Sequence, residues 1–172
     1  MKTLDLKNCD KKYFSQAWEL YENSFPIEEK RTPKEQEIIS KDERYNPIIF
    51  LKDDEVVAIL FFWQYEKHTF IEHLAISHKL RGQSYGSKII EDFLEKYKNV
   101  VLEIELISDE ITQKRFNFYK RFNFIINDYK HFQIPFRKGA KELELLILSH
   151  NNKLEKTEYE KLYCEMKNSL SV

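Results

Sequence analysis

The chain has only three glycines among its 172 residues, and two of them, Gly82 and Gly86, lie close together. An apolar segment with a strand pattern, Phe70 to Ile76, precedes them, and an amphipathic helical pattern, Ser84 to Tyr97, follows. Glycine adopts backbone conformations that other residues avoid, and a turn of small residues before a helix directs free N–H groups toward one point. The segment therefore predicts an anion-binding loop at a helix N-terminus.

Basic residues surround this loop, since Lys79, Arg81 and Lys88 are its neighbours. The loop has neither the GxxxxGK[ST] pattern of a P-loop nor the GxGxxG pattern of a dinucleotide-binding turn. The residues alone leave two interpretations open. One is a phosphate-binding turn of another class, and the other is an ordinary helix N-terminus with a flexible entry.

Strand and helix patterns alternate along the rest of the chain. Helices are expected over 10–24, from 32–33 onward, over 84–97 and 111–122 and in a tail beyond 150, and strands over 48–51, 56–65, 69–77, 100–107, 124–129 and 143–149. This order predicts a single α/β domain with a mixed, twisted sheet of about six to seven strands and helices on both faces. We expect residues 1–149 to form this domain, and 150–172 to form a helical extension packed on it or on a second subunit.

Composition narrows the class of protein. The net charge is −1, which argues against nucleic-acid binding by bulk electrostatics. No apolar run approaches the ~20 residues that span a bilayer, and the N-terminus does not have the pattern of a signal peptide. Cys9 and Cys164 are far apart, which suits a reducing cytoplasm, and the five histidines show no metal-ligand spacing. We therefore expect a cytoplasmic protein without a metal site or a membrane partner.

Two motifs carry a resemblance to a known family. The segment Ile71 to Ile90 resembles motif A of the GNAT superfamily of acyl-CoA N-acyltransferases, Q/R-x-x-G-x-G/A after a strand, with Arg81 at its first position and Gly86 at its last. Ser84 replaces the inner glycine, and it either limits the approach of a pyrophosphate or requires a negative φ. Phe118 to Phe124 resembles the FYxxxGF motif, with Asn123 in place of glycine. Asparagine tolerates the left-handed conformation next best after glycine.

Two weaker fragments point to one bacterial branch of this superfamily. Ser24 to Arg31 is similar to its FPxEER stretch, and Gln133 to Phe136 resembles its QPPY stretch. The resemblance thus covers residues 10–148.

The resemblance implies acetyl-CoA as the co-substrate. The backbone of Leu74, Ala75 and Ile76, on a strand that separates from its neighbour, would bind the pantetheine amides, and the amide of Leu74 would face the thioester oxygen. The pyrophosphate would lie against the loop that follows. The residues expected there are Arg81, Gly82, Gln83, Ser84, Tyr85, Gly86 and Ser87.

The resemblance also implies catalytic residues. Tyr119 is at the position of the family's general acid, although a chain with ten tyrosines has many that only pack. Glu72 or Glu103 would be the base, with Glu72 preferred because strand alternation puts it beside Leu74. Strand alternation also puts His73 on the opposite face. Glu28 and Glu29 could line the acceptor cleft.

The function expected from these motifs is N-acetyl transfer from acetyl-CoA to a primary amine of a small molecule or peptide, by direct attack in a ternary complex. The alternative is a non-catalytic acyl-CoA-binding module with a sensing or regulatory role. Either protein would be a monomer or a homodimer.

Overall fold

The computed structural model describes residues 1–137, 139 and 141–171. Its sheet has eight strands in the order β1-β2-β3-β4-β5-β8-β6, with β7 paired to β8. The strands are β1 (Lys2–Asp5), β2 (Tyr45–Lys52), β3 (Glu55–Gln64), β4 (Thr69–Ile76), β5 (Val100–Glu105), β6 (Phe124–Ile126), β7 (His131–Phe132) and β8 (Glu144–His150). Only β4 and β5 pair in parallel, so the sheet is mixed, as the sequence predicts.

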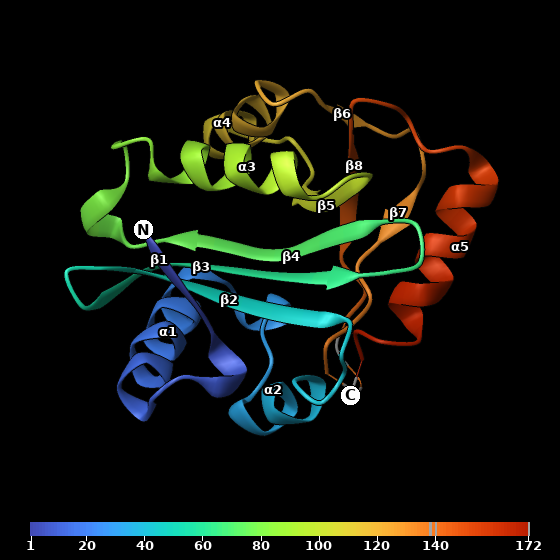
Figure 1. The fold of residues 1–172 in the computed structure, drawn as a ribbon. Coiled ribbons are helices and arrows are strands. Elements are labelled where there is room, and N and C mark those ends of the chain that lie inside the picture. Colours follow the sequence, from blue (N-terminus) through green and yellow to red (C-terminus); the bar gives the residue numbers. More distant parts are fainter. Residues whose placement is uncertain (138, 140, 172) are drawn as a thin grey trace.

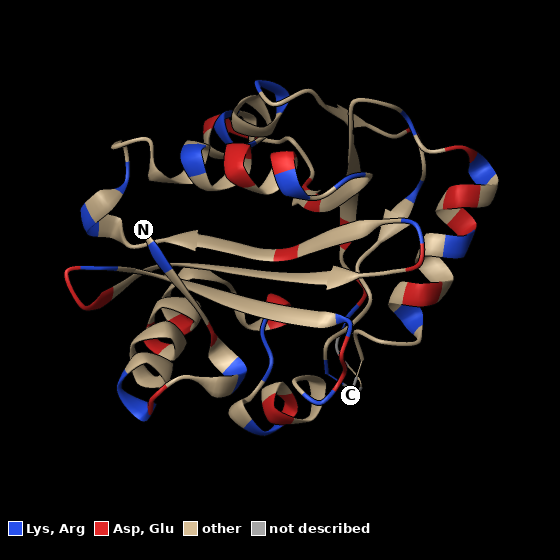
Figure 2. Ribbon diagram, viewed as in Figure 1, with Lys and Arg blue, Asp and Glu red and all other residues tan. Residues whose placement is uncertain are grey.

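Helices cover both faces of this sheet (Figure 1). They are α1 (Lys11–Ser24), α2 (Pro33–Ile39), α3 (Tyr85–Lys96), α4 (Glu110–Lys120) and α5 (Lys156–Lys167), with 3-10 turns η1 (Leu6–Asn8), η2 (Ile27–Glu29) and η3 (His78–Leu80). In Figure 1, α3 and α4 lie on one side of the sheet, α1 and α2 on the other, and α5 beside the β7 end. Most charged segments lie on helices and turns (Figure 2).

Local sequence signals explain most element boundaries. Thr32 caps α2 through a capping box with Glu35, and Pro33 follows at the first helical position. Asp10 is the N-cap residue of α1, although its side chain makes no capping hydrogen bond. β1 and β7 were not predicted, because β1 is short and largely exposed and β7 has only two residues.

The strand β4 does not alternate regularly. Its pairing with β3 slips at Glu72, because Phe61 lies opposite His73 while the next residue, Phe62, lies opposite Ile71. Such a bulge moves the following residues to the other face. The predictions that Glu72 shares a face with Leu74, and that His73 lies on the opposite face from Glu72, are therefore wrong. The carboxylate of Glu72 accepts from the indole Nε1 of Trp63, a residue of the core beneath α1 and α2.

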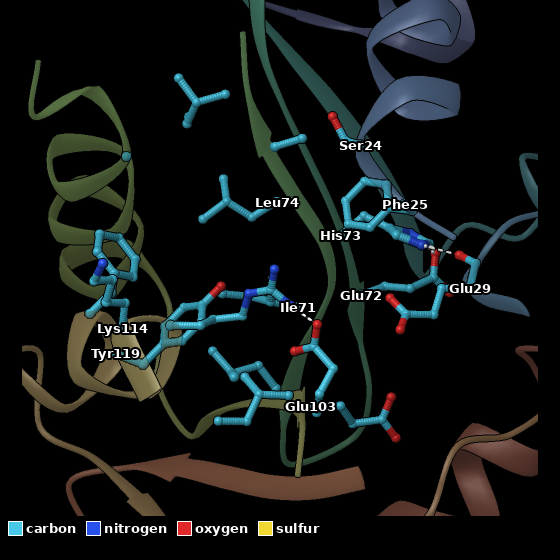
Figure 3. A pocket seen from close by; sticks show the side chains of 18 of the residues that line it. Ser24, Phe25, Glu29, Ile71, Glu72, His73, Leu74, Glu103, Lys114 and Tyr119 are labelled. Carbon is cyan, nitrogen blue, oxygen red and sulfur yellow. Dashed lines mark hydrogen bonds and ion pairs between the residues drawn. The ribbon is translucent and has the colours of Figure 1, made fainter. Parts of the chain in front are cut away.

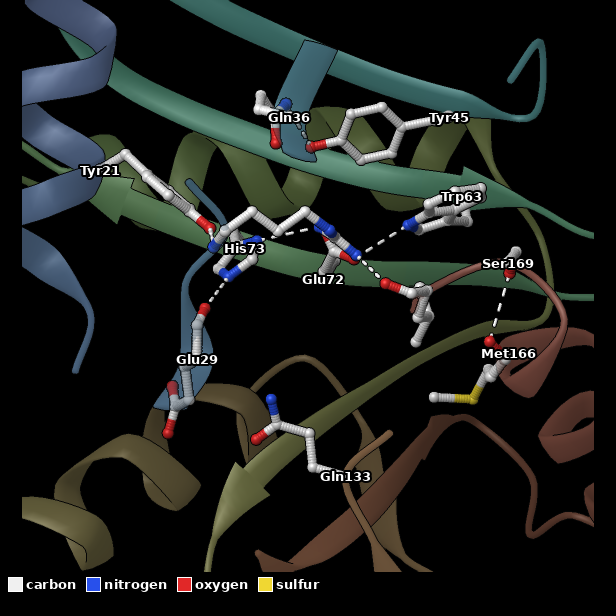
Figure 4. Close-up of polar contacts among 12 residues, drawn as sticks. Tyr21, Glu29, Gln36, Tyr45, Trp63, Glu72, His73, Gln133, Met166 and Ser169 are labelled. Atoms are coloured by element: carbon white, nitrogen blue, oxygen red, sulfur yellow. Dashed lines mark hydrogen bonds and ion pairs between the residues drawn. The ribbon is translucent and has the colours of Figure 1, made fainter. Parts of the chain in front are cut away.

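Glu72 of β4 forms a buried ion pair with Arg31 (Figure 4). The guanidinium donates from Nη1 and Nη2 to the two carboxylate oxygens at 2.7 and 2.8 Å, and Nη2 also donates to the Leu170 carbonyl. Both side chains are fully buried. The pair therefore connects the segment after η2 to β4 and to the C-terminal residues.

Burial alone would raise the pKa of Glu72, but the positive charge of Arg31 and the hydrogen bonds to His73 and Arg31 outweigh it and lower that pKa to about 2. Arg31 also stacks on the ring of Phe136, with 4.3 Å from its guanidinium carbon to the ring centroid. A carboxylate in this state is an anchor for the fold and does not act as a proton acceptor near neutral pH.

The C-terminal segment packs on the same core. Leu162, Met166 and Leu170 are fully buried, and the Tyr65 hydroxyl lies 2.7 Å from the Ser169 hydroxyl. Residues beyond 150 thus cover β-sheet core surface that would otherwise be exposed to water.

Glu72→Gln should destabilise the protein by about 3–5 kcal/mol, because the buried guanidinium loses its counter-charge. Since the folded-state pKa of Glu72 lies below its usual value of 4.5, the pair stabilises the fold above that pH and loses this contribution as the pH falls toward about 2. Urea unfolding of both proteins between pH 2 and pH 7 measures the difference.

The matched control is Glu160→Gln, an exposed carboxylate on α5, which should change stability by less than about 1 kcal/mol. If Glu72→Gln retains the wild-type loss of stability below pH 4.5, the ion pair does not cause that loss.

Candidate active site

A cavity of about 680 Å³ opens where β4 and β5 separate. The two strands pair only from Thr69 opposite Val100 to Ile71 opposite Leu102, so the later residues of β4 have no partner strand on that side. The predicted separation of this strand from its neighbour is confirmed. Backbone groups of residues 74–76 are therefore available to a ligand that lies in the gap.

The loop between β4 and α3 forms one end of the cavity. Gly82 and Ser84 both adopt left-handed conformations, with φ of +76° and +62°. Of the two alternatives expected for Ser84, the negative φ is not found, because the turn into α3 imposes the left-handed conformation on the residue before the helix. The backbone N–H groups of Gly82, Ser84, Tyr85, Gly86 and Ser87 have no acceptor among the described residues.

The predicted coenzyme-binding residues converge on this end. Those that line the cavity are Leu74, Ala75, Ile76, Arg81, Gly82, Ser84, Tyr85, Gly86 and Ser87. Gln83 does not line the cavity, and its side-chain Nε2 donates to the Lys79 carbonyl at 3.0 Å. Arg81, Lys114 and Arg121 add positive charge to the lining, which together with the free N–H groups suits an anionic ligand.

Gly86 has an ordinary backbone conformation and leaves room for one added carbon atom. A Cβ atom at this position would meet Ile76 and Phe118 at 3.6 Å, which is ordinary contact, and its φ is not positive. A longer side chain would project among residues that line the cavity. Asn123 has φ +60°, which confirms that asparagine keeps the left-handed turn after α4.

Tyr119 lies near the C-terminal end of α4 and lines the cavity, across from Glu29 and Glu103 (Figure 3). Its ring packs edge-on against Phe118 and Phe124. None of the described residues hydrogen-bonds its hydroxyl. Burial raises its pKa to about 12, with Arg115 acting in the opposite direction. The hydroxyl is therefore protonated at neutral pH and available as a proton donor.

Two carboxylates, Glu29 and Glu103, line the other end of the cavity. Burial raises the pKa of Glu29, the negative charges of Glu103 and Glu28 act in the same direction, and His73 and Arg115 oppose them. The Glu103 Oε1 lies 2.5 Å from the Nε2 of His131. The side chain of Glu28 does not line the cavity.

Sequence reasoning missed His131 and Gln133 as residues of this end. His131 is buried behind Glu103, and Gln133 lines the cavity beside Phe136. The only sequence signal for Gln133 was its place in the QIPF segment, and no local pattern marked His131, because its contact with Glu103 spans β8.

Comparisons with known proteins agree with this geometry. The sequence profile of the Acetyltransferase (GNAT) family matches residues 12–124, and the chain belongs to that family. YjbC of Bacillus subtilis, itself named only as a candidate acetyltransferase, is 33% identical over 134 residues, which span 76% of this chain and 63% of that protein.

Solved structures show the same fold. A GNAT-family protein of Bacteroides thetaiotaomicron superposes with a TM-score of 0.87 at 25% identity over 96% of both chains. A GNAT-family acetyltransferase of Elizabethkingia anophelis, solved with acetyl-CoA bound, superposes with a TM-score of 0.57 at 11% identity over 87% of this chain and 96% of that one. No helix among the described residues is long and apolar enough to cross a membrane.

Gly86→Glu should abolish acetyl-CoA binding, because its side chain brings bulk and negative charge to the end of the cavity that suits an anion. Gly86→Ala is the control, since its added Cβ meets only ordinary contacts, and it should bind within about threefold of wild type. Calorimetric titration with acetyl-CoA measures both. Unchanged affinity in Gly86→Glu would exclude this loop as the coenzyme site.

Proposed function

We propose that this protein is an N-acetyltransferase that transfers the acetyl group of acetyl-CoA to a primary amine of a small molecule or peptide in a ternary complex. The observation that carries the proposal is one continuous cavity with three chemically distinct parts. An anion-binding loop lies at one end, a protonated tyrosine stands beside the gap between β4 and β5, and two carboxylates lie at the other end.

The free N–H groups of Gly82 and of residues 84–87 suit the pyrophosphate of acetyl-CoA, and Arg81 and Arg121 add charge to the same end. The separated backbone of β4 suits the pantetheine amides, and the amide of Leu74 is assigned to the thioester oxygen. Acetyl-CoA bound in this way supplies an activated acetyl group. The Elizabethkingia structure, in which acetyl-CoA is bound to the same fold, supports this assignment.

Glu29 is assigned as the proton acceptor. Its carboxylate has no hydrogen-bond partner among the described residues, and its raised pKa suits a base that works near neutral pH. It takes a proton from the acceptor ammonium, which frees the nitrogen lone pair to form the new C–N bond as the C–S bond breaks. Tyr119 then gives its proton to the departing thiolate, and the resulting phenolate takes back the second proton that the nitrogen loses as it becomes an amide. Glu72 has no such role, because Arg31 holds it as a buried anion.

A non-catalytic acyl-CoA-binding module would need the loop but neither the proton donor nor the carboxylates. Ser84 and Asn123 stand where the family motifs have glycine, which is the feature that favours a module without activity. Both residues nevertheless keep the left-handed backbone conformation. Thiol release from acetyl-CoA across a panel of primary amines distinguishes the two functions. Release that depends on an added amine supports the enzyme, and binding without release supports the module.

Tyr119→Phe should lower kcat about 100-fold, because it removes the proton donor and leaves the ring in its packing. Tyr97→Phe is the control, since Tyr97 packs on Phe62 and Phe93 away from the cavity and should keep normal turnover. Steady-state kinetics and melting temperature are measured for both. A normal kcat in Tyr119→Phe would remove tyrosine as the acid.

Glu29→Gln should flatten the acidic limb of the pH–rate profile. A base acts only when deprotonated, so the wild-type rate falls as the pH drops through the Glu29 pKa, and burial places that limb above the usual glutamate range. Glu28→Gln, which changes an exposed neighbouring side chain, should keep the limb and move it only slightly toward lower pH, because the charge of Glu28 raises the pKa of Glu29. An unchanged limb in Glu29→Gln would show that another group, or water, accepts the proton.

A further inference from the structure

The end of the cavity opposite the anion-binding loop presents hydrogen-bond acceptors from three separate elements. Glu29 comes from η2, Glu103 from β5 and Gln133 from the segment after β7. The two carboxylates are close enough for the charge of Glu103 to raise the pKa of Glu29. A ligand that satisfies these groups must bring N–H donors and positive charge.

The orientation of the Gln133 amide is fixed by its neighbour. Its Nε2 lies 3.4 Å from the Glu28 carbonyl, which accepts hydrogen bonds but donates none. The amide nitrogen must therefore face that carbonyl, and the oxygen faces away from it. Gln133 is only 4% exposed, and its Oε1 has no hydrogen-bond partner among the described residues. A buried acceptor without a donor is costly, so this oxygen indicates a missing ligand group.

A chain of hydrogen bonds through His131 and Tyr159 fixes the side chain of Glu103. His131 is 1% exposed, with its Nε2 at 2.5 Å from Glu103 Oε1 and its Nδ1 at 2.9 Å from the Tyr159 hydroxyl. A carboxylate oxygen only accepts, so Nε2 of His131 donates to Glu103. One carboxylate oxygen of Glu103 is thereby committed to His131, while the side chain still lines the cavity. The ring of Tyr159 is itself fixed by stacking on Tyr129 at 4.1 Å.

No lysine or arginine among the described residues forms an ion pair with Glu29 or Glu103. Arg115 also lines the cavity, but its guanidinium pairs with Glu105 on the same strand as Glu103. Arg31 is committed to Glu72. The transfer reaction needs one carboxylate to accept a proton, and that role falls to Glu29. Glu103 therefore supplies a second negative charge that takes no part in the proton transfer.

We propose that Glu103 and Gln133 form a subsite for a second cationic group of the acceptor, so that the substrate class is a small amine with two positive charges, such as a diaminoalkane. The reacting ammonium lies at Glu29, and the second ammonium donates to the free oxygen of Glu103 and to Gln133 Oε1. His131 is a positioning residue in this arrangement, since it orients Glu103 without touching the substrate. This substrate class rests on the proposed N-acetyl transfer.

Binding tests the subsite without any turnover. The full chain saturated with coenzyme A is titrated by calorimetry with 1,3-diaminopropane, 1,4-diaminobutane and 1,5-diaminopentane, and with the monoamine of each length. At least one diamine should bind 10-fold or more tightly than its monoamine, because only the diamine pairs with both carboxylates. Equal affinities in all three pairs would overturn the proposal.

Variants of the subsite residues test which side chains cause the preference for diamines. Glu103→Gln and Gln133→Leu should each reduce the diamine-to-monoamine ratio severalfold, whereas Glu144→Gln, which removes the same charge from an exposed position on β8 outside the cavity, should retain it. If Glu144→Gln reduces the ratio as much as Glu103→Gln does, the preference is a general charge effect and the subsite is refuted. Melting temperatures of all variants identify any that fail to fold, and the wild-type comparison does not depend on them.

Turnover separates this proposal from the proposed function. Thiol release with the preferred diamine supports both. Tight, Glu103-dependent diamine binding without thiol release leaves the subsite standing and refutes the transferase. Release with monoamines and diamines at equal kcat/KM, together with equal binding, retains the transferase and refutes the subsite.

Discussion

The early end of the pairing between β4 and β5 is the constraint on which the rest of the site depends. Parallel strands that stop sharing hydrogen bonds after Ile71 and Leu102 leave backbone donors and acceptors that water or a ligand must satisfy. The same separation creates the cavity and brings the α3 loop, Tyr119 and Glu103 around one space. The proposed coenzyme binding and acyl transfer would thus both use one interruption of the sheet.

The buried pair of Arg31 and Glu72 keeps the acceptor side of that space in place. Arg31 lies two residues after Glu29, the last residue of η2. The pair joins this part of the chain to β4 and to the carbonyl of Leu170. A bulge in β4 turns Glu72 toward Arg31 and away from the face of Leu74. The charge that sequence reasoning preferred as a base is therefore structural, and a neighbouring carboxylate without a partner takes its place as the candidate.

Backbone requirements were the most predictable part of the site. Gly82 and Asn123 hold left-handed conformations at the two motif turns, as residue type and spacing predict, whereas the left-handed conformation of Ser84 was not predicted. Side-chain partners were less predictable. His131 reaches Glu103 across β8, and Gln133 meets the carbonyl of Glu28, so both contacts join segments that are distant along the chain.

The amino-acid sequence alone is enough to predict the family, the mixed sheet with helices on both faces, the turn before α3 and the place of Tyr119 on α4, because these depend on local periodicity and on residues that permit a particular turn. Which carboxylate is buried, which is free and which is held by a histidine depends on contacts that form only in the folded protein. A single bulge inverts the faces of a strand, and the protonation of a carboxylate depends on the charges and the water around it, which the fold alone brings together.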